Sequence, residues 1–202
     1  MTTTPKGAAL DVRPLTPDRL NDLAGLFEEG GDPKWCWCTY FRFRGRYWTN
    51  STAAGNREAL EALTRRDDLA PGLLAYRDDR VIGWISLGPR EDYERLAKST
   101  LMAPVDDTPV WSIVCFVVSR RARGQGVATA LLAAGIDYAR AHGATMLEAY
   151  PVDATDGRVP AAVAFRGTLG MFERAGFIVV ERRRWNATTP VRPIVRMALE
   201  PT

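Results

Sequence analysis

Residues 111–132 constrain the fold of this chain more than any other stretch, and they read WSIVCFVVSRRARGQGVATALL. The first eight, Trp111 to Val118, are apolar and include several β-branched residues, a composition that favours a buried strand. A basic turn with two glycines follows. Apolar residues then recur with the spacing of one helix face, at Val127, Ala130, Leu131, Ala134 and Tyr138. We predict a strand, a glycine-containing turn and a helix that begins at the glycines.

The predicted helix start is suited to bind a phosphate group. The first turn of a helix has backbone N–H groups without intrahelical partners, and the helix dipole is positive at that end. Glycine allows a ligand to approach the backbone closely. The turn lacks the Gly-Lys-Ser/Thr of a P-loop and the three spaced glycines of a dinucleotide fold. It therefore predicts a phosphate site of another kind.

The length of 202 residues is enough for one well-filled core, so we expect a single domain over residues 1–202. Within it, residues 8–70 would supply an N-terminal strand, helices and an aromatic segment. Residues 71–152 would supply the central sheet with the phosphate site. Residues 153–202 would supply a last helix and the last strands.

Charge and composition argue against several classes of protein. The formal net charge is +3 with scattered basic residues, whereas a nucleic-acid-binding protein usually gathers them on one face. No apolar run reaches the length of a membrane span, and the first residues lack the apolar core of a signal peptide. Three cysteines, an odd number, argue against a disulfide scaffold. We expect a cytoplasmic protein without nucleic-acid or membrane partners.

Hydrophobic periodicity and turn residues outline the remaining elements. Predicted strands cover residues 8–12, 72–76, 81–87, 111–118, 145–150, 177–181 and 194–199. Predicted helices cover residues 17–29, 51–66, 91–98, 127 to about 142, and 161–175, and Ser51 or Thr52 would cap the second of them. Because strands and helices alternate only in the second half, we expect an α/β fold of the α+β type. Its sheet would be mixed and mostly antiparallel, with six to seven strands and helices on both faces.

Two motifs in this order of elements resemble the GNAT superfamily of acetyl-CoA-dependent N-acetyltransferases. The family motif Gln/Arg-x-x-Gly-x-Gly/Ala matches the run from Arg123 to Ala128, directly at the predicted helix start. A second register, from Arg121 to Gly126, also fits but begins earlier in the turn. Downstream, the run from Met171 to Phe177 is similar to the family's helix that ends in Tyr-Glu-x-x-Gly-Phe.

The resemblance implies a site for acetyl-CoA as the acyl donor, and from the residues we expect no metal. The pyrophosphate would bind the turn, at Arg123, Gly124, Gln125, Gly126, Val127 and Ala128. The pantetheine arm would lie along the central strand at Phe116, Val117 and Val118. A backbone N–H near Val117 would then face the thioester oxygen and stabilise an oxyanion.

The resemblance also suggests catalytic groups. Glu148 lies in Leu-Glu-Ala, similar to the Leu-Glu-Val in which some family members have a general base. The alternative is an edge or surface glutamate that pairs with an arginine. The family's usual general acid is a tyrosine in the Gly-Phe helix, but Phe172 stands at that position. Tyr150 is our candidate for the acid, and the alternative is that Tyr150 only lines the pocket.

The aromatic segment from residue 32 to 48 is the candidate acceptor side. Trp35, Trp37 and Tyr40 could line an apolar acceptor pocket, or the segment could pack in the core. Cys36 and Cys38 make a poor metal set because few other ligands are present. We expect acetyl transfer from acetyl-CoA to a primary amine of a small molecule. The alternatives are a protein N-terminus or lysine as acceptor, and a non-catalytic acyl-CoA-binding module. The chain could also form a homodimer.

Overall fold

The computed structural model describes residues 10–66, 69–154, 161–189 and 191–200, and within them seven strands form one sheet in the order β1-β2-β3-β4-β5-β7-β6. The strands are β1 (Asp11–Pro14), β2 (Gly72–Arg77), β3 (Arg80–Pro89), β4 (Trp111–Val118), β5 (Met146–Ala149), β6 (Ile178–Arg183) and β7 (Arg192–Ala198). All neighbours are antiparallel except β4 and β5, which are parallel. The predicted mixed, mostly antiparallel sheet is confirmed.

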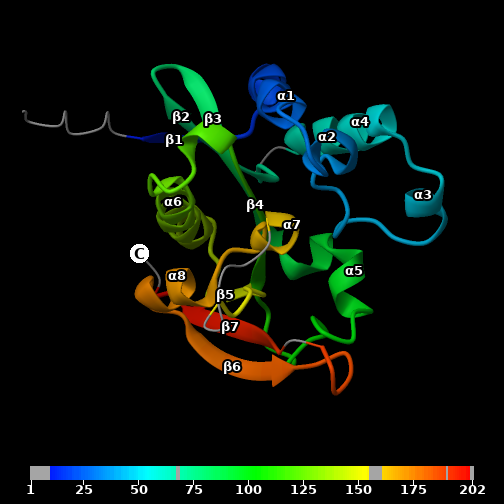
Figure 1. The fold of residues 1–202 in the computed structure, drawn as a ribbon, viewed down its shortest axis with the longest axis vertical. Helices are drawn as coiled ribbons and strands as arrows, with labels where there is room; N and C mark the ends of the chain where they lie inside the picture. Colours follow the sequence, from blue (N-terminus) through cyan, green and yellow to red (C-terminus); the bar gives the residue numbers. More distant parts are fainter. Residues whose placement is uncertain (1–9, 67–68, 155–160, 190, 201–202) are drawn as a thin grey trace, which may run out of the picture.

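Helices cover both faces of this sheet (Figure 1). The α-helices are α1 (Leu20–Glu28), α2 (Pro33–Cys36), α3 (Arg46–Thr49), α4 (Ala53–Thr64), α5 (Glu94–Ala97), α6 (Val127–Ala141), α7 (Ala161–Ala164) and α8 (Leu169–Arg174). The short 3-10 helices are η1 (Pro17–Arg19), η2 (Arg90–Asp92) and η3 (Arg120–Ala122). α1 and α4 contribute to one core cluster, and α6 and α8 contribute to the cluster on the opposite face.

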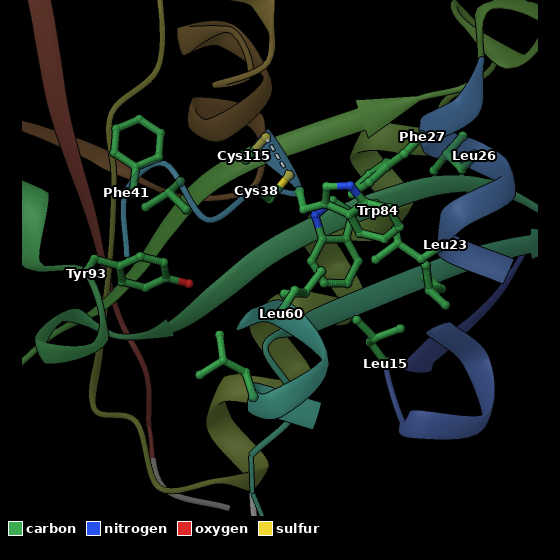
Figure 2. Close-up of a cluster of buried hydrophobic side chains, with 14 of the residues drawn as sticks. Leu15, Leu23, Leu26, Phe27, Cys38, Phe41, Leu60, Trp84, Tyr93 and Cys115 are labelled. Atoms are coloured by element: carbon green, nitrogen blue, oxygen red, sulfur yellow. Dashed lines mark hydrogen bonds between the residues drawn. The ribbon is translucent and has the colours of Figure 1, made fainter. Parts of the chain in front are cut away.

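Alternation along β3 divides the two cores. Trp84 is fully buried on the face of α1 and α4, while its neighbour Ile85 is buried on the face of α6. Trp84 lies at the centre of the first core, edge-on to Phe27 with 6.5 Å between ring centroids (Figure 2). Leu23 and Leu60 pack around it. Each such side chain contributes about 1.5–3 kcal/mol by burial, which fixes both helix layers on the sheet.

β4 is the strand that positions the candidate site. It pairs with β3 over its whole length, but with β5 only from Trp111 to Ile113. A bulge at Val114 shifts the register, since Ser86 pairs with Cys115 and Leu87 with Ile113. Beyond this bulge, no strand of the described chain pairs with the edge of β4 that faces away from β3. The segment that follows α7 lies beside that edge instead.

Several predicted elements are confirmed in place. β4 has the predicted bounds, and α6 begins at Val127 as expected. Thr52 caps α4, because its hydroxyl accepts a hydrogen bond of 3.1 Å from the Gly55 N–H. The hairpin of β2 and β3 turns at Asp78 and Asp79, both in the left-handed conformation that such two-residue turns require.

Three expectations on elements were wrong. The first strand lies at Asp11–Pro14 rather than 8–12, and residues 8 and 9 lie outside the described residues. The helix predicted over 161–175 is two short helices, α7 and α8, because the chain breaks at Gly167 with φ 76°. The helix predicted over 91–98 is reduced to η2 and the single turn α5.

Candidate functional site

The turn between β4 and α6 forms an open cradle of backbone. Gly124 and Gly126 have φ of 74° and 78°, values that L side chains rarely adopt. Gly126 is the N-cap of α6, and no side chain caps the helix there. A Cβ added at either glycine would have no protein atom within 4 Å. The space at both glycines is therefore open, and the first N–H groups of the 15-residue helix α6 follow directly, the combination that a phosphate site requires.

Polar contacts hold this turn in shape. The Gln125 side-chain amide donates to the Arg121 carbonyl at 2.8 Å, and Arg77 donates to the Gln125 side-chain carbonyl oxygen. Glu29, at the end of α1, accepts from the Ser119 hydroxyl at 2.9 Å and from the Arg120 N–H at 3.3 Å. The Glu29 carboxylate thus accepts hydrogen bonds from residues that precede the glycines. The N–H groups at the start of α6 stay available to a ligand.

The free edge of β4 presents backbone donors in alternation. The Phe116 N–H points away from β3 and donates to the Phe165 carbonyl at 2.6 Å. The Ser119 N–H points to the other side and donates to Ile82 of β3 at 3.0 Å. Because neighbouring residues of a strand alternate, the Val118 N–H shares the side of Phe116, and the Val117 N–H faces β3. Donors for a ligand along this edge are therefore Phe116 and Val118.

Glu148 lies in β5 at the centre of a buried ionic network. Its side chain has an exposed fraction of 0%, and each oxygen pairs with a different arginine. Arg90 Nη1 lies 2.6 Å from Oε1, and Arg196 Nε lies 2.8 Å from Oε2. Arg196 also pairs with Asp106 at 2.7 Å. The arginine partners agree with the alternative, but its placement of Glu148 at an edge or on the surface is wrong, because the side chain is fully buried. The general-base role stays a prediction.

Tyr150 belongs to the same network. Its hydroxyl donates to Glu148 Oε1 at 2.7 Å, accepts from Arg90, and lies 3.0 Å from the Ser112 hydroxyl. Burial, and then the charge of Glu148, raise the pKa of Tyr150 above its ordinary value. A buried phenol with a raised pKa is a weak proton donor. The role of Tyr150 as general acid remains a prediction that this environment disfavours.

The aromatic segment divides into a buried and an exposed part. Trp37 is 7% exposed and packs edge-on against Phe27 at 5.4 Å, so it belongs to the core. Trp35 and Tyr40 are 44% and 38% exposed, and each ring lies edge-on to Trp48 at 5.0 Å. The backbone is not extended here, because α2 is followed by Trp37 and Cys38 in the left-handed conformation. Trp35 and Tyr40 remain candidates for an acceptor wall.

The phenylalanines of the helix region connect this wall with β4. Phe165 lies 6.4 Å from Phe41, between ring centroids, and its carbonyl is the partner of the Phe116 N–H. Phe172, at the position of the family's tyrosine, is fully buried and packs edge-on against Phe116 at 6.1 Å. Phe172 therefore supports the strand by packing and brings no proton donor to its edge.

Cys38 and Cys115 are buried thiols of the core, whereas Cys36 is only partly buried. Cys38 donates to the Cys115 sulfur at 3.5 Å (Figure 2). This hydrogen bond and burial raise the pKa of Cys38, which disfavours a thiolate. Among the described residues, no group of three or more His, Cys, Asp or Glu side chains is arranged to hold a metal ion. No helix in the described ranges is long and apolar enough to cross a membrane.

Sequence reasoning missed Arg90, Arg196 and the Phe165 carbonyl. The two arginines lie 58 and 48 residues from Glu148 along the chain, and nothing local marks them as its partners. The Phe165 carbonyl is a backbone group, and its place beside Phe116 depends on the break after α7. Only a tertiary structure brings these groups together.

In this mostly antiparallel sheet, β4 separates from β5 after three residue pairs, and an anion-binding turn follows β4. This is the architecture of an acyl-CoA-dependent acetyltransferase. The chain matches the model of the Acetyltransferase (GNAT) family over residues 34–177 and belongs to this family. Among proteins with curated descriptions, none matches this sequence.

Solved structures with the same fold share little sequence with this chain. A polyamine N-acetyltransferase from Drosophila melanogaster is 11% identical, with a TM-score of 0.60 over 95% of this chain and 100% of that chain. A GNAT-family acetyltransferase from Streptococcus pneumoniae is 13% identical, with a TM-score of 0.55 and the same coverage. A NatC complex bound to Gag peptide and CoA is 16% identical, with a TM-score of 0.52 over 96% and 100%. These similarities show the fold, and acetyl-CoA is the cosubstrate of the family.

Proposed function

We propose that this protein transfers the acetyl group of acetyl-CoA to a primary amine of a small molecule within a ternary complex. The observation that supports this most is the pair of donors on the free edge of β4, directly before the glycine turn. The Phe116 N–H bonds a carbonyl oxygen in the present structure, and a thioester oxygen is the same kind of acceptor. Binding of acetyl-CoA here would displace the Phe165 carbonyl.

The proposal assigns the pyrophosphate to the turn from Arg123 to Ala128. The open space at Gly124 and Gly126 would admit phosphate oxygens, and Arg123 is exposed beside them. The pantetheine would follow the edge of β4, with Phe116 and Val118 as backbone partners. Val117 would contribute through its side chain rather than its N–H.

The reaction needs a neutral amine and a site for the departing thiolate. The amine nitrogen attacks the thioester carbonyl, a C–N bond forms, the C–S bond breaks, and coenzyme A leaves with the proton that the nitrogen loses. The Phe116 N–H would stabilise the oxyanion. Glu148 and Tyr150 are hydrogen-bonded to Arg90 of η2 and to each other. We propose that these bonds fix η2 against β5 beside the site.

The acceptor is proposed to approach from the side of Trp35 and Tyr40. The exposed Tyr40 ring contacts the buried ring of Phe41, which in turn lies beside Phe165 and the β4 edge. A small acceptor fits this aromatic surface better than a polypeptide does, because peptide recognition needs an extended polar groove. A protein amine remains the alternative acceptor.

Release of the coenzyme A thiol, assayed across a panel of small amines and peptides, tests the proposal. We expect release with at least one small amine, and a product that mass spectrometry identifies as the N-acetyl derivative. Turnover on peptides alone would favour a protein acceptor. Tight binding of acetyl-CoA without turnover on any acceptor would favour the non-catalytic module.

A further inference from the structure

Arg166 directly follows the residue that occupies the β4 edge. Phe165 bonds the Phe116 N–H through its carbonyl, so the Arg166 backbone lies beside the proposed thioester position. The Arg166 guanidinium packs at 5.3 Å from the centroid of the Phe165 ring and at 5.8 Å from that of Phe41. The side chain is thus folded over the acceptor side of the site, partly buried among aromatic rings.

Arg166 has no charge partner among the described residues. No carboxylate there lies within ion-pair distance, and its guanidinium makes no hydrogen bond with them. By contrast, the buried Arg42 pairs with Asp92 at 3.2 Å, and Arg196 pairs with two carboxylates. A partly buried guanidinium is normally paired, because leaving it unpaired costs free energy.

Arg192 adds positive charge near this guanidinium. Burial lowers the pKa of Arg166, and the nearby charge of Arg192 lowers it further. Arg192 likewise has no ion pair within the described part of the chain. Arg95 lies 4.0 Å from the centroid of the Tyr40 ring, and its nitrogens donate to the carbonyls of Tyr40 and Phe43. The acceptor side is therefore aromatic and cationic.

We propose that Arg166, assisted by Arg192, binds a carboxylate of the acceptor, so that the acceptor is a small primary amine that also carries a carboxylate group. This inference rests on the proposed amine acetylation and narrows its substrate class to amino acids. An arginine binds a carboxylate through two parallel hydrogen bonds, which fixes both the position and the orientation of the ligand. The apolar side chain of such an acceptor would lie against Phe41 and Tyr40.

Matched pairs of acceptors test this subsite. L-phenylalanine and phenethylamine differ only in the carboxylate, as do L-leucine and isoamylamine. For the wild-type protein we expect kcat/KM to be about ten- to a hundredfold higher for each amino acid, the range of a charge-assisted hydrogen-bonded contact. Arg166→Gln should remove this preference, so that the ratio of the two kcat/KM values within each pair falls to about one. Arg166→Lys should retain part of it.

The control variant is Arg80→Gln, which removes the same charge at an exposed position at the start of β3. It should keep the preference for amino acids. Arg192→Gln is a second test at the site, for the case in which Arg166→Gln does not fold. Equal or better turnover of the plain amines by the wild type, or a preference that survives both site variants, would overturn the proposal.

A binding measurement separates this proposal from the enzymatic one. With coenzyme A present, thermal shift should show tighter binding of N-acetyl-L-phenylalanine than of N-acetylphenethylamine, and Arg166→Gln should abolish the difference. This readout does not need turnover. Absence of any acetylation would contradict the proposed function, whereas absence of the carboxylate preference in binding would contradict only the subsite.

Discussion

A leucine at Gly126 should weaken acetyl-CoA binding far more than it weakens the fold. Gly126 has φ 78° at the start of α6, and a leucine there costs about 1–2 kcal/mol of folding free energy by left-handed strain. No protein atom lies within 4 Å of the added Cβ, so there is no clash to add to this cost. For a chain of this size, the midpoint of thermal unfolding should fall by about 2–8 °C.

The same side chain would stand where we place the pyrophosphate. Each charge-assisted hydrogen bond from an amide to a phosphate oxygen contributes about 1.5–3 kcal/mol, and loss of two would weaken binding a hundredfold or more. At about 100 times the dissociation constant, acetyl-CoA stabilises the wild type by about 2.7 kcal/mol, or roughly 5–11 °C. Gly126→Leu should lose nearly all of this shift at the same ligand concentration.

Gly143 provides a matched control at the other end of α6. It also has φ 78° and no protein atom within 4 Å of a Cβ. Gly143→Leu should therefore show the same loss of stability and an unchanged affinity for acetyl-CoA in calorimetry. Equal affinities of the two variants would refute the assignment of the pyrophosphate to this turn.

Three further predictions follow from the network and the caps. Glu148→Gln should lower the free energy of unfolding by about 3–5 kcal/mol in denaturant titrations, because Arg90 and Arg196 lose a buried partner. The control is Glu181→Gln, at the more exposed pair with Arg183, which should lower it by under about 1 kcal/mol. The pH–rate profile of Glu148→Gln should keep its shape, and loss of its acidic limb would restore Glu148 as the base. The hydrogen bond from Arg196 holds the pKa of Asp106 below its ordinary value of 3.8. The ionised Asp106 therefore stabilises the folded protein fully above pH 3.8, and this contribution declines as the pH falls further. Asp106→Asn should make the loss of stability in acid less steep. Thr52→Ala should lower the free energy of unfolding by about 1 kcal/mol through the lost cap of α4, and the affinity for acetyl-CoA should stay unchanged. A weaker affinity would contradict a purely local role of Thr52.

Local patterns in the sequence predicted the parts of the fold that depend on local rules. β4 follows from its β-branched run, α6 from its 3.6-residue periodicity, and the cap at Thr52 from residue type. The glycines of the turn are also a local signal, since their positive φ belongs to a few residues. The mixed, mostly antiparallel character of the sheet followed from the order of strands and helices.

Tertiary effects decided what local patterns missed. The periodicity over 161–175 favoured one helix, but Gly167 breaks it where the Phe165 carbonyl meets β4. Trp37 lies in the core because its backbone is in the left-handed conformation, which its residue type does not predict. The environment of Glu148 depends on arginines from η2 and β7, and periodicity carries no information on such distant partners.

Mass spectrometry of a panel of amines and amino acids, incubated with the wild-type protein and acetyl-CoA, tests the central claim most directly. We predict that at least one amine-containing small molecule gains an acetyl group, with one coenzyme A thiol released for each product formed. A panel that remains unmodified while calorimetry shows acetyl-CoA bound would contradict the claim that this protein is an N-acetyltransferase of small amines.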